Sequence, residues 1–301
     1  MNIAQFNARG PKNGVEHWFD LIHDELERQG HNVVQYWVRG RQPTWNEIQE
    51  IDFCLYHFSQ VAFLYMRSIG KPFCVLPSAN DIFPNNGETL MKVSKNRNCK
   101  FVTYQSLYHI KKYKEWEIEG QFQYVPMPVR VDTFKRNRKY NPDFKYLAGG
   151  RLIPKKGLHQ LKGIDNLRIF GDGPLRDELQ RMMPNVEFLG ELNVTKLKNA
   201  YERSSLYLFP AVVTGDGDSD GIPNTIKEAM LMKLPVIASP IAGIPELENI
   251  DILTDWSADN LKRILNEFDF KPNWKGEREI RNTYNPRNCV NLLLERIYSF
   301  L

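Results

Sequence analysis

Short apolar runs alternate with amphipathic segments along the first part of the chain. Runs such as "NIAQFN" and "NVVQYW" have the length and apolar character of buried strands. Trp18, Phe19, Ile22 and Leu26 recur at helical spacing within residues 15–29, which predicts an amphipathic helix there. The pattern further predicts strands at 53–58, 71–76 and 100–104, and helices at 61–69 and 105–117.

A second series with the same alternation follows a polar, basic stretch, "DTFKRNRKYNPD". It predicts strands, each followed by a helix, at 144–150, 167–173, 186–190, 206–211 and 234–239. Strands that alternate with helices are typical of parallel sheets covered by helices. We therefore predict an α/β protein with two Rossmann-like, doubly wound domains, over residues 1–134 and 135–285. A C-terminal helix over residues 286–301 is expected to pack back on the first domain.

Composition narrows the class of protein. A chain of 301 residues, 42% hydrophobic and 25% charged, has the size and balance of a globular protein of two domains. The net charge of +4 is too small to indicate nucleic-acid binding, but it fits an anionic small-molecule ligand. No apolar run approaches the ~20 residues of a membrane span, and the first residues lack the apolar core of a signal peptide. A cytoplasmic location with reduced cysteines is therefore expected.

The strand ends are where ligands bind in doubly wound sheets, at the crevice outside the carboxyl ends. Arg151 and Lys156 follow the strand at 144–150, and a guanidinium and an ammonium so placed suit a phosphate or diphosphate. Taken alone, they are better interpreted as surface cations of a solvated loop. Gly171 and Gly173 follow the next strand and resemble half of a dinucleotide fingerprint. Because the third glycine is missing, a tight strand-to-helix turn before Pro174 is the better interpretation.

The acidic stretch "DGDSDG" at residues 216–221 opens like a calcium-binding loop. Such a loop needs a bidentate Glu at its twelfth position. That position is Lys227, and Glu228 comes one residue late. Calcium binding is therefore not expected.

The stretch "DGIPNTIKEAM" places acids on both sides of a turn that begins a predicted helix. Pro223 suits the first turn of that helix, which leaves the backbone NH groups of residues 221, 222 and 224 open to an anion. Asp220 precedes the turn and Glu228 lies on the helix. An anion beside a carboxylate is unfavourable unless the carboxylate binds hydroxyls, so a ligand with both phosphates and hydroxyls, a nucleotide-sugar, fits both groups. The alternative is that Asp220 merely interacts with the helix dipole and Glu228 is an exposed helix residue.

The chain resembles the retaining glycosyltransferases of family four, which have the two-domain GT-B fold. The resemblance is strongest between residues 146 and 246, where several motifs follow one another in the family's order. The motifs are "LAGGRLIPKKG", "LRIFGDGPLRDEL", "VEFLGEL", "LKNAYERSSLYLFPA", "DGIPNTIKEAM" and "LPVIASPIAGIPE". Two further stretches before residue 146, "NGVE" and "YVPMPVRVDTF", also resemble segments of the family. The first domain would then lie on the acceptor side of a central cleft, and the second would bind the nucleotide-sugar.

The resemblance implies a role for each candidate residue. Arg151 and Lys156 would hold the diphosphate, Asp220 would contact the transferred sugar, and Glu228 would contact the ribose. Backbone groups near the sugar and phosphates complete the expected donor site; they belong to Gly14, Gly171, Gly190, Gly221, Ile222, Pro223 and Asn224. Asp220, Arg151 and Lys156 are the expected catalytic residues, and no metal or cofactor is expected.

Two departures from the family pattern concern the sugar and acceptor side. The first acid is usually Glu, and here it is the shorter Asp220. The family commonly carries a His in the first domain, in a pattern like His-Gly-x-Asp. Ser78 stands in its place here, whereas Asp81 still matches. His57 lies at the end of another strand and could line the acceptor side instead, although a lone His at the end of an apolar strand is more often structural.

The resemblance implies a metal-independent hexosyltransferase that retains the anomeric configuration by same-face displacement, acting in polysaccharide or glycoconjugate synthesis. The donor would be a UDP-sugar in preference to a GDP-sugar, and the acceptor a glycan or lipid-linked glycan. A GT-B sugar-nucleotide epimerase and a non-catalytic nucleotide-sugar-binding subunit are the alternatives. The basic, aromatic stretches "LYHIKKYKEW" and "KRNRKY" could contact an anionic membrane, although a solvated helix face is the simpler interpretation.

Overall fold

The computed structural model describes residues 1–8, 16–79, 86–136, 144–215 and 217–301. The chain divides into two compact units, one of residues Met1–Arg130 with Thr283–Leu301 and the other of Val131–Asn282. The sequence-based boundaries, 134/135 and 285/286, lie within four residues of these divisions. Gly14 and Asp81 fall outside the described residues, so the structure does not place them.

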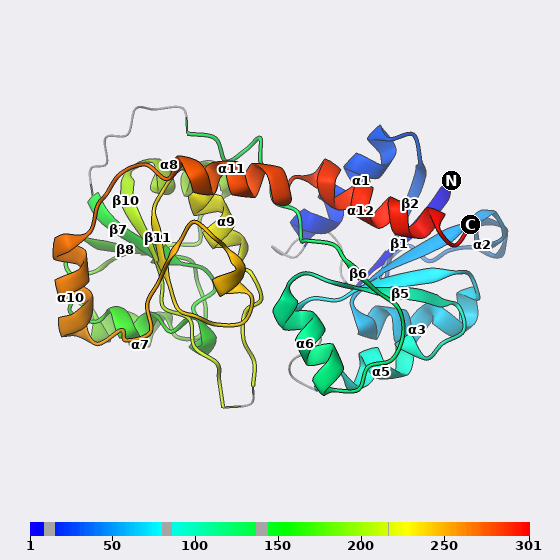
Figure 1. Cartoon of the computed structure of the whole chain (residues 1–301), viewed down its shortest axis with the longest axis horizontal. Helices are drawn as coiled ribbons and strands as arrows, with labels where there is room; N and C mark the ends of the chain where they lie inside the picture. Colours follow the sequence, from blue (N-terminus) through cyan, green and yellow to red (C-terminus); the bar gives the residue numbers. More distant parts are fainter. Residues whose placement is uncertain (9–15, 80–85, 137–143, 216) are drawn as a thin grey trace. The chain divides into compact units, whose positions relative to one another are not determined.

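The first unit contains a six-stranded parallel sheet with helices on both faces (Figure 1). Its strand order is β2-β1-β3-β4-β5-β6. The strands are β1 (Asn2–Asn7), β2 (Asn32–Trp37), β3 (Phe53–His57), β4 (Phe73–Leu76), β5 (Cys99–Tyr104) and β6 (Phe122–Tyr124). The helices are α1 (Glu16–Arg28), α2 (Trp45–Glu50), α3 (Ser59–Ile69), α5 (Glu88–Ser94), α6 (Leu107–Glu115) and α12 (Pro286–Tyr298).

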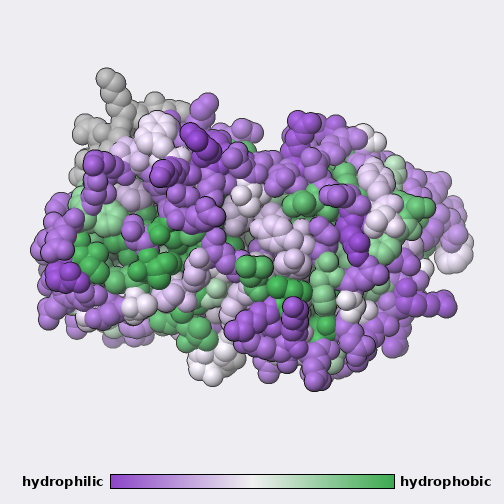
Figure 2. Space-filling model, viewed as in Figure 1, coloured by the Kyte–Doolittle hydropathy of each residue, from purple (hydrophilic) through white to green (hydrophobic). Residues whose placement is uncertain are grey.

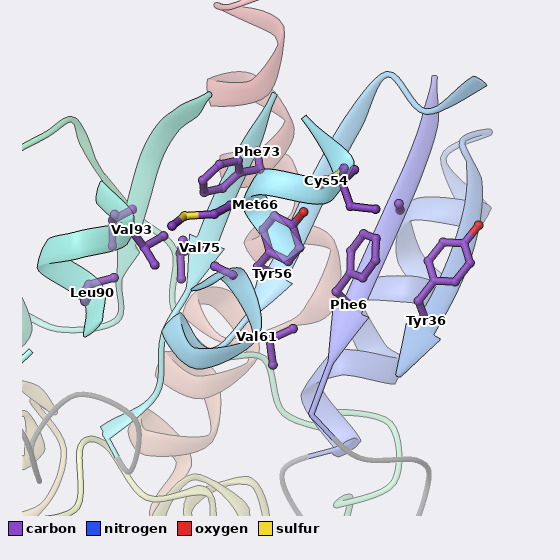
Figure 3. Packing of buried hydrophobic residues seen from close by; sticks show 14 of the residues in the cluster. Phe6, Tyr36, Cys54, Tyr56, Val61, Met66, Phe73, Val75, Leu90 and Val93 are labelled. Atoms are coloured by element: carbon purple, nitrogen blue, oxygen red, sulfur yellow. The ribbon is translucent and has the colours of Figure 1, made fainter. Parts of the chain in front are cut away.

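Alternate residues of the first unit's strands pack on opposite faces of the sheet, as the two-residue period of a strand requires. In β3, Tyr56 belongs to the core cluster that also contains Phe6 and residues of α3 and α5 (Figure 3). Leu55, the residue before it, belongs to the cluster on the other face, with residues of α1 and α12. Because both faces are buried, these strands are almost continuously apolar, which is why the sequence reveals them so clearly.

Helix α12 is the last helix of the chain, yet it completes the core of the first unit. Val290 and Leu293 are fully buried there together with Ile22 and Leu26 of α1. The start of α12 follows from local sequence, because the Asn285 side chain accepts a hydrogen bond from the amide of Asn288 and a proline occupies the first turn.

The second unit contains another six-stranded parallel sheet, in the order β12-β11-β10-β7-β8-β9. Its strands are β7 (Phe144–Gly149), β8 (Leu167–Phe170), β9 (Glu187–Gly190), β10 (Ser204–Phe209), β11 (Val236–Ala238) and β12 (Asp251–Ile252). Its α-helices are α7 (Arg176–Met182), α8 (Val194–Glu202), α9 (Asn224–Leu231), α10 (Ala258–Glu267) and α11 (Trp274–Thr283). Helices again cover both faces of the sheet (Figure 1). These two sheets confirm the predicted doubly wound α/β class.

The sequence pattern did not predict several elements, most of them short. Among them are the strands β6 and β12 and the helices α2, α5 and α11. Strand β12 has two residues and α2 has six, none of them fully buried, so neither carries a periodic pattern long enough to recognise. The helix expected to begin near Pro174 begins at Arg176.

Strands β7 and β10 are neighbours in the second sheet, although a long stretch of chain separates them. They pair in parallel, with Leu206 opposite Tyr146 and Tyr207 opposite Leu147. The loops that follow the two strands therefore leave the sheet at the same edge, side by side. This pairing positions the candidate site.

Hydrophilic residues cover most of the face in Figure 2, with apolar residues between them. None of the helices in the described segments has both the length and the apolar character needed to cross a membrane. The basic residues of α6 are partly paired, since Lys112 Nζ lies 2.6 Å from Glu115 Oε2. Most of the stretch "KRNRKY" lies outside the described residues. Membrane contact by either stretch stays a prediction.

Candidate functional site

The loop after β7 and the loop after β10 are joined through their backbones. Lys155 and Lys156 form a short 3-10 turn that ends at Gly157, whose φ is +61°. A Cβ on Gly157 would lie 1.8 Å from the carbonyl oxygen of Pro210, so only glycine allows the loops to approach this closely. The amide of Val212 donates to the carbonyl of Lys155 at 3.0 Å. The turn is therefore fixed against the loop that carries the acids.

Two lysines of the first loop pair with two aspartates of the second. Lys155 Nζ lies 2.9 Å from Asp218 Oδ1 and 3.9 Å from Asp220 Oδ1. Lys156 Nζ lies 2.8 Å from Asp220 Oδ2 and 5.0 Å from the centre of the Phe209 ring. Two predicted site residues, Lys156 and Asp220, are thus in direct contact. Their charges compensate one another at the edge of the sheet.

Arg151 is placed differently from the two lysines. It lies in the turn directly after β7, and its side chain is exposed. Within the described chain, its guanidinium forms no ion pair. Arg151 can therefore turn toward an anionic ligand without first breaking an ion pair with another described residue.

The N-terminus of α9 offers open backbone donors. Pro223 is the N-cap, and α9 begins at Asn224. The amides of Gly221, Ile222 and Asn224 donate no hydrogen bond to any other described residue. The side-chain oxygen of Asn224 is also buried without a described partner. Amides at a helix start attract anions, so this turn is suited to a phosphate or to sugar oxygens.

Glu228 lies on α9 with its side chain almost completely buried. The hydroxyl of Tyr201, on α8, donates to Glu228 Oε2 at 3.2 Å and also lies 3.2 Å from the carbonyl oxygen of Thr225. Burial raises the pKa of Tyr201 well above its ordinary value, and the neighbouring carboxylate of Glu228 raises it further. Tyr201 therefore keeps its proton and acts as a fixed donor to Glu228.

Gly171 directly follows β8, and Gly190 is the last residue of β9. Gly171 has a φ of +107°, and a Cβ there would lie 1.8 Å from the carbonyl oxygen of Gly150. Its amide donates to the carbonyl of Gly190 at 2.7 Å. Gly190 has a φ of +69° with open space where a Cβ would be. Gly171 thus allows the loops after β7 and β8 to pack closely, which agrees with its tight-turn interpretation.

The structure corrects the expectation that His57 lines an acceptor site. His57 ends β3 and is completely buried, with its ring centre 4.5 Å from that of Trp18 and 4.3 Å from that of Phe19. Burial lowers the pKa of His57 to about 3, so the ring is neutral. A side chain without accessible surface cannot contact an acceptor. Ser78, just after β4, is also buried, and its hydroxyl has no partner among the described residues.

Sequence reasoning missed three residues that organise the site. In the sequence, Lys155 and Asp218 are only neighbours of expected site residues, and Tyr201 is only one residue of a family motif. No sequence signal assigned any of the three a role in the site. In the stretch "DGDSDG", the carboxylates of Asp218 and Asp220 each lie beside a lysine ammonium group, and Asp216 falls outside the described residues. The residue in the twelfth position, Lys227, is buried within α9. No group of potential metal ligands occurs in the described part of the chain.

Comparison with known sequences identifies the region that holds this site. Residues 152–265 match the model of the family "Glycosyl transferases group 1". The putative colanic acid biosynthesis glycosyltransferase WcaL of Escherichia coli strain K12 is 35% identical over 145 residues, which are 43% of this chain and 34% of WcaL. A GDP-mannose-dependent alpha-mannosyltransferase of Mycolicibacterium smegmatis is 36% identical over 115 residues, 36% of this chain and 29% of that protein. These alignments thus span about a third of each curated relative.

Comparison with solved structures covers the whole chain. HepE (Alr3699) of Anabaena, whose crystal structure is a complex with UDP, superposes with a TM-score of 0.78 at 16% identity, covering 99% of this chain and all of HepE. At that identity the likeness shows the fold. The chain therefore has the GT-B fold, and its residues 152–265 are similar to the glycosyl transferases group 1 family, which confirms the predicted resemblance at that level.

Proposed function

We propose that the protein is a retaining, metal-independent glycosyltransferase that moves a sugar from a nucleoside-diphosphate donor to a hydroxyl of a glycan or lipid-linked glycan. The observation that carries the proposal is the grouping at one sheet edge of cations, open helix-start amides and a nearly buried carboxylate. These belong to Arg151, Lys156, residues 221–224 and Glu228. The group 1 domain match spans this edge, from just after Arg151 onward.

The proposed donor contacts follow from the chemistry of each group. The guanidinium of Arg151 and the ammonium of Lys156 suit the diphosphate, as do the amides at the start of α9. The Glu228 carboxylate suits ribose hydroxyls, because a nearly buried acceptor held by Tyr201 keeps one orientation. The Asp220 carboxylate would accept a hydrogen bond from a hydroxyl of the transferred sugar. We favour a UDP-sugar, since HepE is known with UDP, and the mannosyltransferase relative makes GDP-mannose the alternative.

In the proposed reaction the bond between the anomeric carbon and the diphosphate oxygen breaks. The acceptor hydroxyl attacks on the face from which the diphosphate leaves, and its proton passes to a phosphate oxygen of the leaving group. Arg151 and Lys156 stabilise the negative charge that accumulates on that group, and the backbone amides hold it in place. Catalysis would rest on positioning and on charge stabilisation, without a protein nucleophile.

Incubation of the purified protein with radiolabelled UDP-sugars and GDP-sugars and a hydroxyl acceptor tests this proposal. Label in the acceptor supports a transferase. An isomerised donor would indicate the epimerase, and saturable binding without turnover would indicate a nucleotide-sugar-binding subunit. Proton NMR of the product tests retention, since an α-linked donor must give an α-linked product. Transfer that continues at an unchanged rate in EDTA supports metal independence.

A further inference from the structure

Lys155 is a nearly buried cation to which the proposed reaction assigns no role. Its side chain is 4% exposed. Its ammonium lies 2.9 Å from Asp218 Oδ1, 3.4 Å from the carbonyl oxygen of Ser219 and 3.9 Å from Asp220 Oδ1. Burying an ammonium group is costly unless oxygens surround it. Lys155 is therefore held in place by the loop that carries Asp220.

Asp220 lies between two ammonium groups that differ in accessibility. Its Oδ1 is directed toward Lys155, whereas its Oδ2 lies 2.8 Å from Lys156 Nζ. The side chain of Lys156 is 12% exposed, three times as much as that of Lys155. Lys156 also lies on the diphosphate side of the proposed site, next to Gly150 and its turn. Of the two lysines, Lys156 is the one that a ligand reaches.

A diphosphate bound by Lys156 creates an electrostatic problem for Asp220. The carboxylate then shares or loses its nearest cation and acquires an anionic neighbour. Like charges at short range repel strongly where water is excluded. A second cation that does not bind the ligand removes this repulsion, because it stays beside the Asp220 carboxylate. Lys155 meets that requirement, because Asp218 and the Ser219 carbonyl keep its ammonium beside Asp220.

We propose, on the basis of the proposed function, that Lys155 is a positioning residue for donor binding. It neutralises Asp220 and holds the carboxylate in place while Lys156 binds the diphosphate. The Asp218 carboxylate in turn holds the ammonium group of Lys155. The backbone carbonyl of Asp218 accepts hydrogen bonds at 3.0 Å from both the amide and the hydroxyl of Thr214. The ion pair of Lys155 and Asp218 thus allows an acid and a diphosphate to occupy adjoining positions.

Calorimetric titration with UDP and with GDP tests this role on the parent protein, Lys155→Met, Asp220→Asn and the double variant. Lys155→Met is expected to weaken nucleoside-diphosphate binding by about tenfold, because Asp220 then competes for Lys156. In the Asp220→Asn background the same substitution should change the affinity by less than about twofold. Removing the uncompensated acid would thus rescue binding, a result that a purely structural Lys155 cannot give. An equal loss in both backgrounds would overturn the inference.

Asp218→Asn is the matched control for the loop itself, since it removes the other carboxylate partner of Lys155 and leaves Asp220 intact. Its expected effect is about threefold or less. A loss as large as that of Lys155→Met would mean that the lysine only secures the loop. If Lys155→Met does not fold, Lys155→Gln replaces it, because its amide can still donate to Asp218. A parent protein that neither binds these nucleotides nor transfers sugar would overturn the proposed function; additive effects in an active parent overturn this inference alone.

Discussion

Lys156 Nζ lies 2.8 Å from Asp220 Oδ2, so two residues expected to bind different parts of one donor bind each other. The lysine follows β7 and the aspartate follows β10, and the pairing of these strands brings the two side chains together. A donor would have to compete with Asp220 for Lys156. The ion pair therefore links the affinity for the diphosphate to the acid that would contact the sugar.

Asp220→Asn should separate binding from transfer. The substitution frees Lys156 from its carboxylate partner, so UDP or GDP should bind as tightly as to the parent or more tightly. Transfer should fall by about 10- to 100-fold, because a hydrogen bond from a hydroxyl to a charged group contributes about 1.5–3 kcal/mol. Calorimetry and steady-state transfer assays measure the two effects. Weaker nucleotide binding with an unchanged rate would remove Asp220 from the sugar side of the site.

Arg151→Ala should lower the turnover number by about 10²–10³, the usual effect of removing one preorganised donor to a developing charge. Donor affinity should change less, since charge accumulates on the diphosphate mainly in the transition state. Arg151→Lys should recover part of the loss, because an ammonium lacks the forked geometry of the guanidinium. Single-turnover transfer at saturating donor measures this effect.

The control for Arg151 is Arg181→Ala, which removes another exposed arginine of the second unit, on α7. Both variants should melt within a few degrees of the parent, because neither side chain is buried. If Arg151→Ala transfers sugar within a few-fold of the Arg181→Ala rate, the diphosphate is held elsewhere and the interpretation of "GGRLIPKKG" fails.

Glu228→Ala should weaken binding of the free nucleoside diphosphate by roughly 1.5–3 kcal/mol, because the ribose loses a charged acceptor. Tyr201→Phe should weaken it by a smaller amount, about 0.5–1.5 kcal/mol, since the carboxylate stays but loses the donor that orients it. Calorimetry with the nucleoside diphosphate and with pyrophosphate, which lacks both ribose and base, separates nucleoside contacts from phosphate contacts. Affinity for pyrophosphate should be the same in both variants as in the parent. An equal loss for both ligands would place Glu228 at the phosphates.

His57 should make the folded protein sensitive to acid. Its pKa is lowered to about 3 by burial, whereas the unfolded chain has the ordinary value near 6.5. Between these values the unfolded state binds a proton that the folded state does not. The stabilisation from neutral His57 is thus complete above pH 6.5 and is lost as the pH falls toward 3. The free energy of unfolding that His57 contributes then falls by up to about 1.4 kcal/mol per pH unit.

Urea unfolding at several pH values between 7 and 4 checks the contribution of His57. Below pH 6 the free energy of unfolding should fall with acid less steeply in His57→Phe than in the parent. The difference between the two slopes should be about 1.4 kcal/mol per pH unit. Phenylalanine is chosen because the ring lies between Trp18 and Phe19 and forms no described hydrogen bond. Parallel curves for the parent and the variant would show that His57 is not the titrating group.

Much of the fold could be predicted from the sequence, because its causes are local. Strands such as β1 and β3 are apolar runs whose two faces are both buried, and α1 carries its apolar residues on the face that packs. The start of α9 is likewise encoded by adjacent residues, a proline N-cap at 223 and the turn before it. The candidate donor residues could be predicted for the same reason, since they directly follow strands that the pattern reveals.

The tertiary structure decided which of those residues contact one another. The sequence by itself placed Lys156 and Asp220 at strand ends, but their ion pair depends on β7 lying next to β10, which local periodicity does not encode. The sequence contains two adjacent lysines at this place. Only the packing of the folded chain makes Lys155 nearly buried and leaves Lys156 more exposed. The sequence also left His57 as a candidate contact, whereas the packing of Trp18 and Phe19 over the end of β3 buried the ring. Burial and ion pairing depend on neighbours far away in sequence, and so the chemistry of the site was decided by the fold.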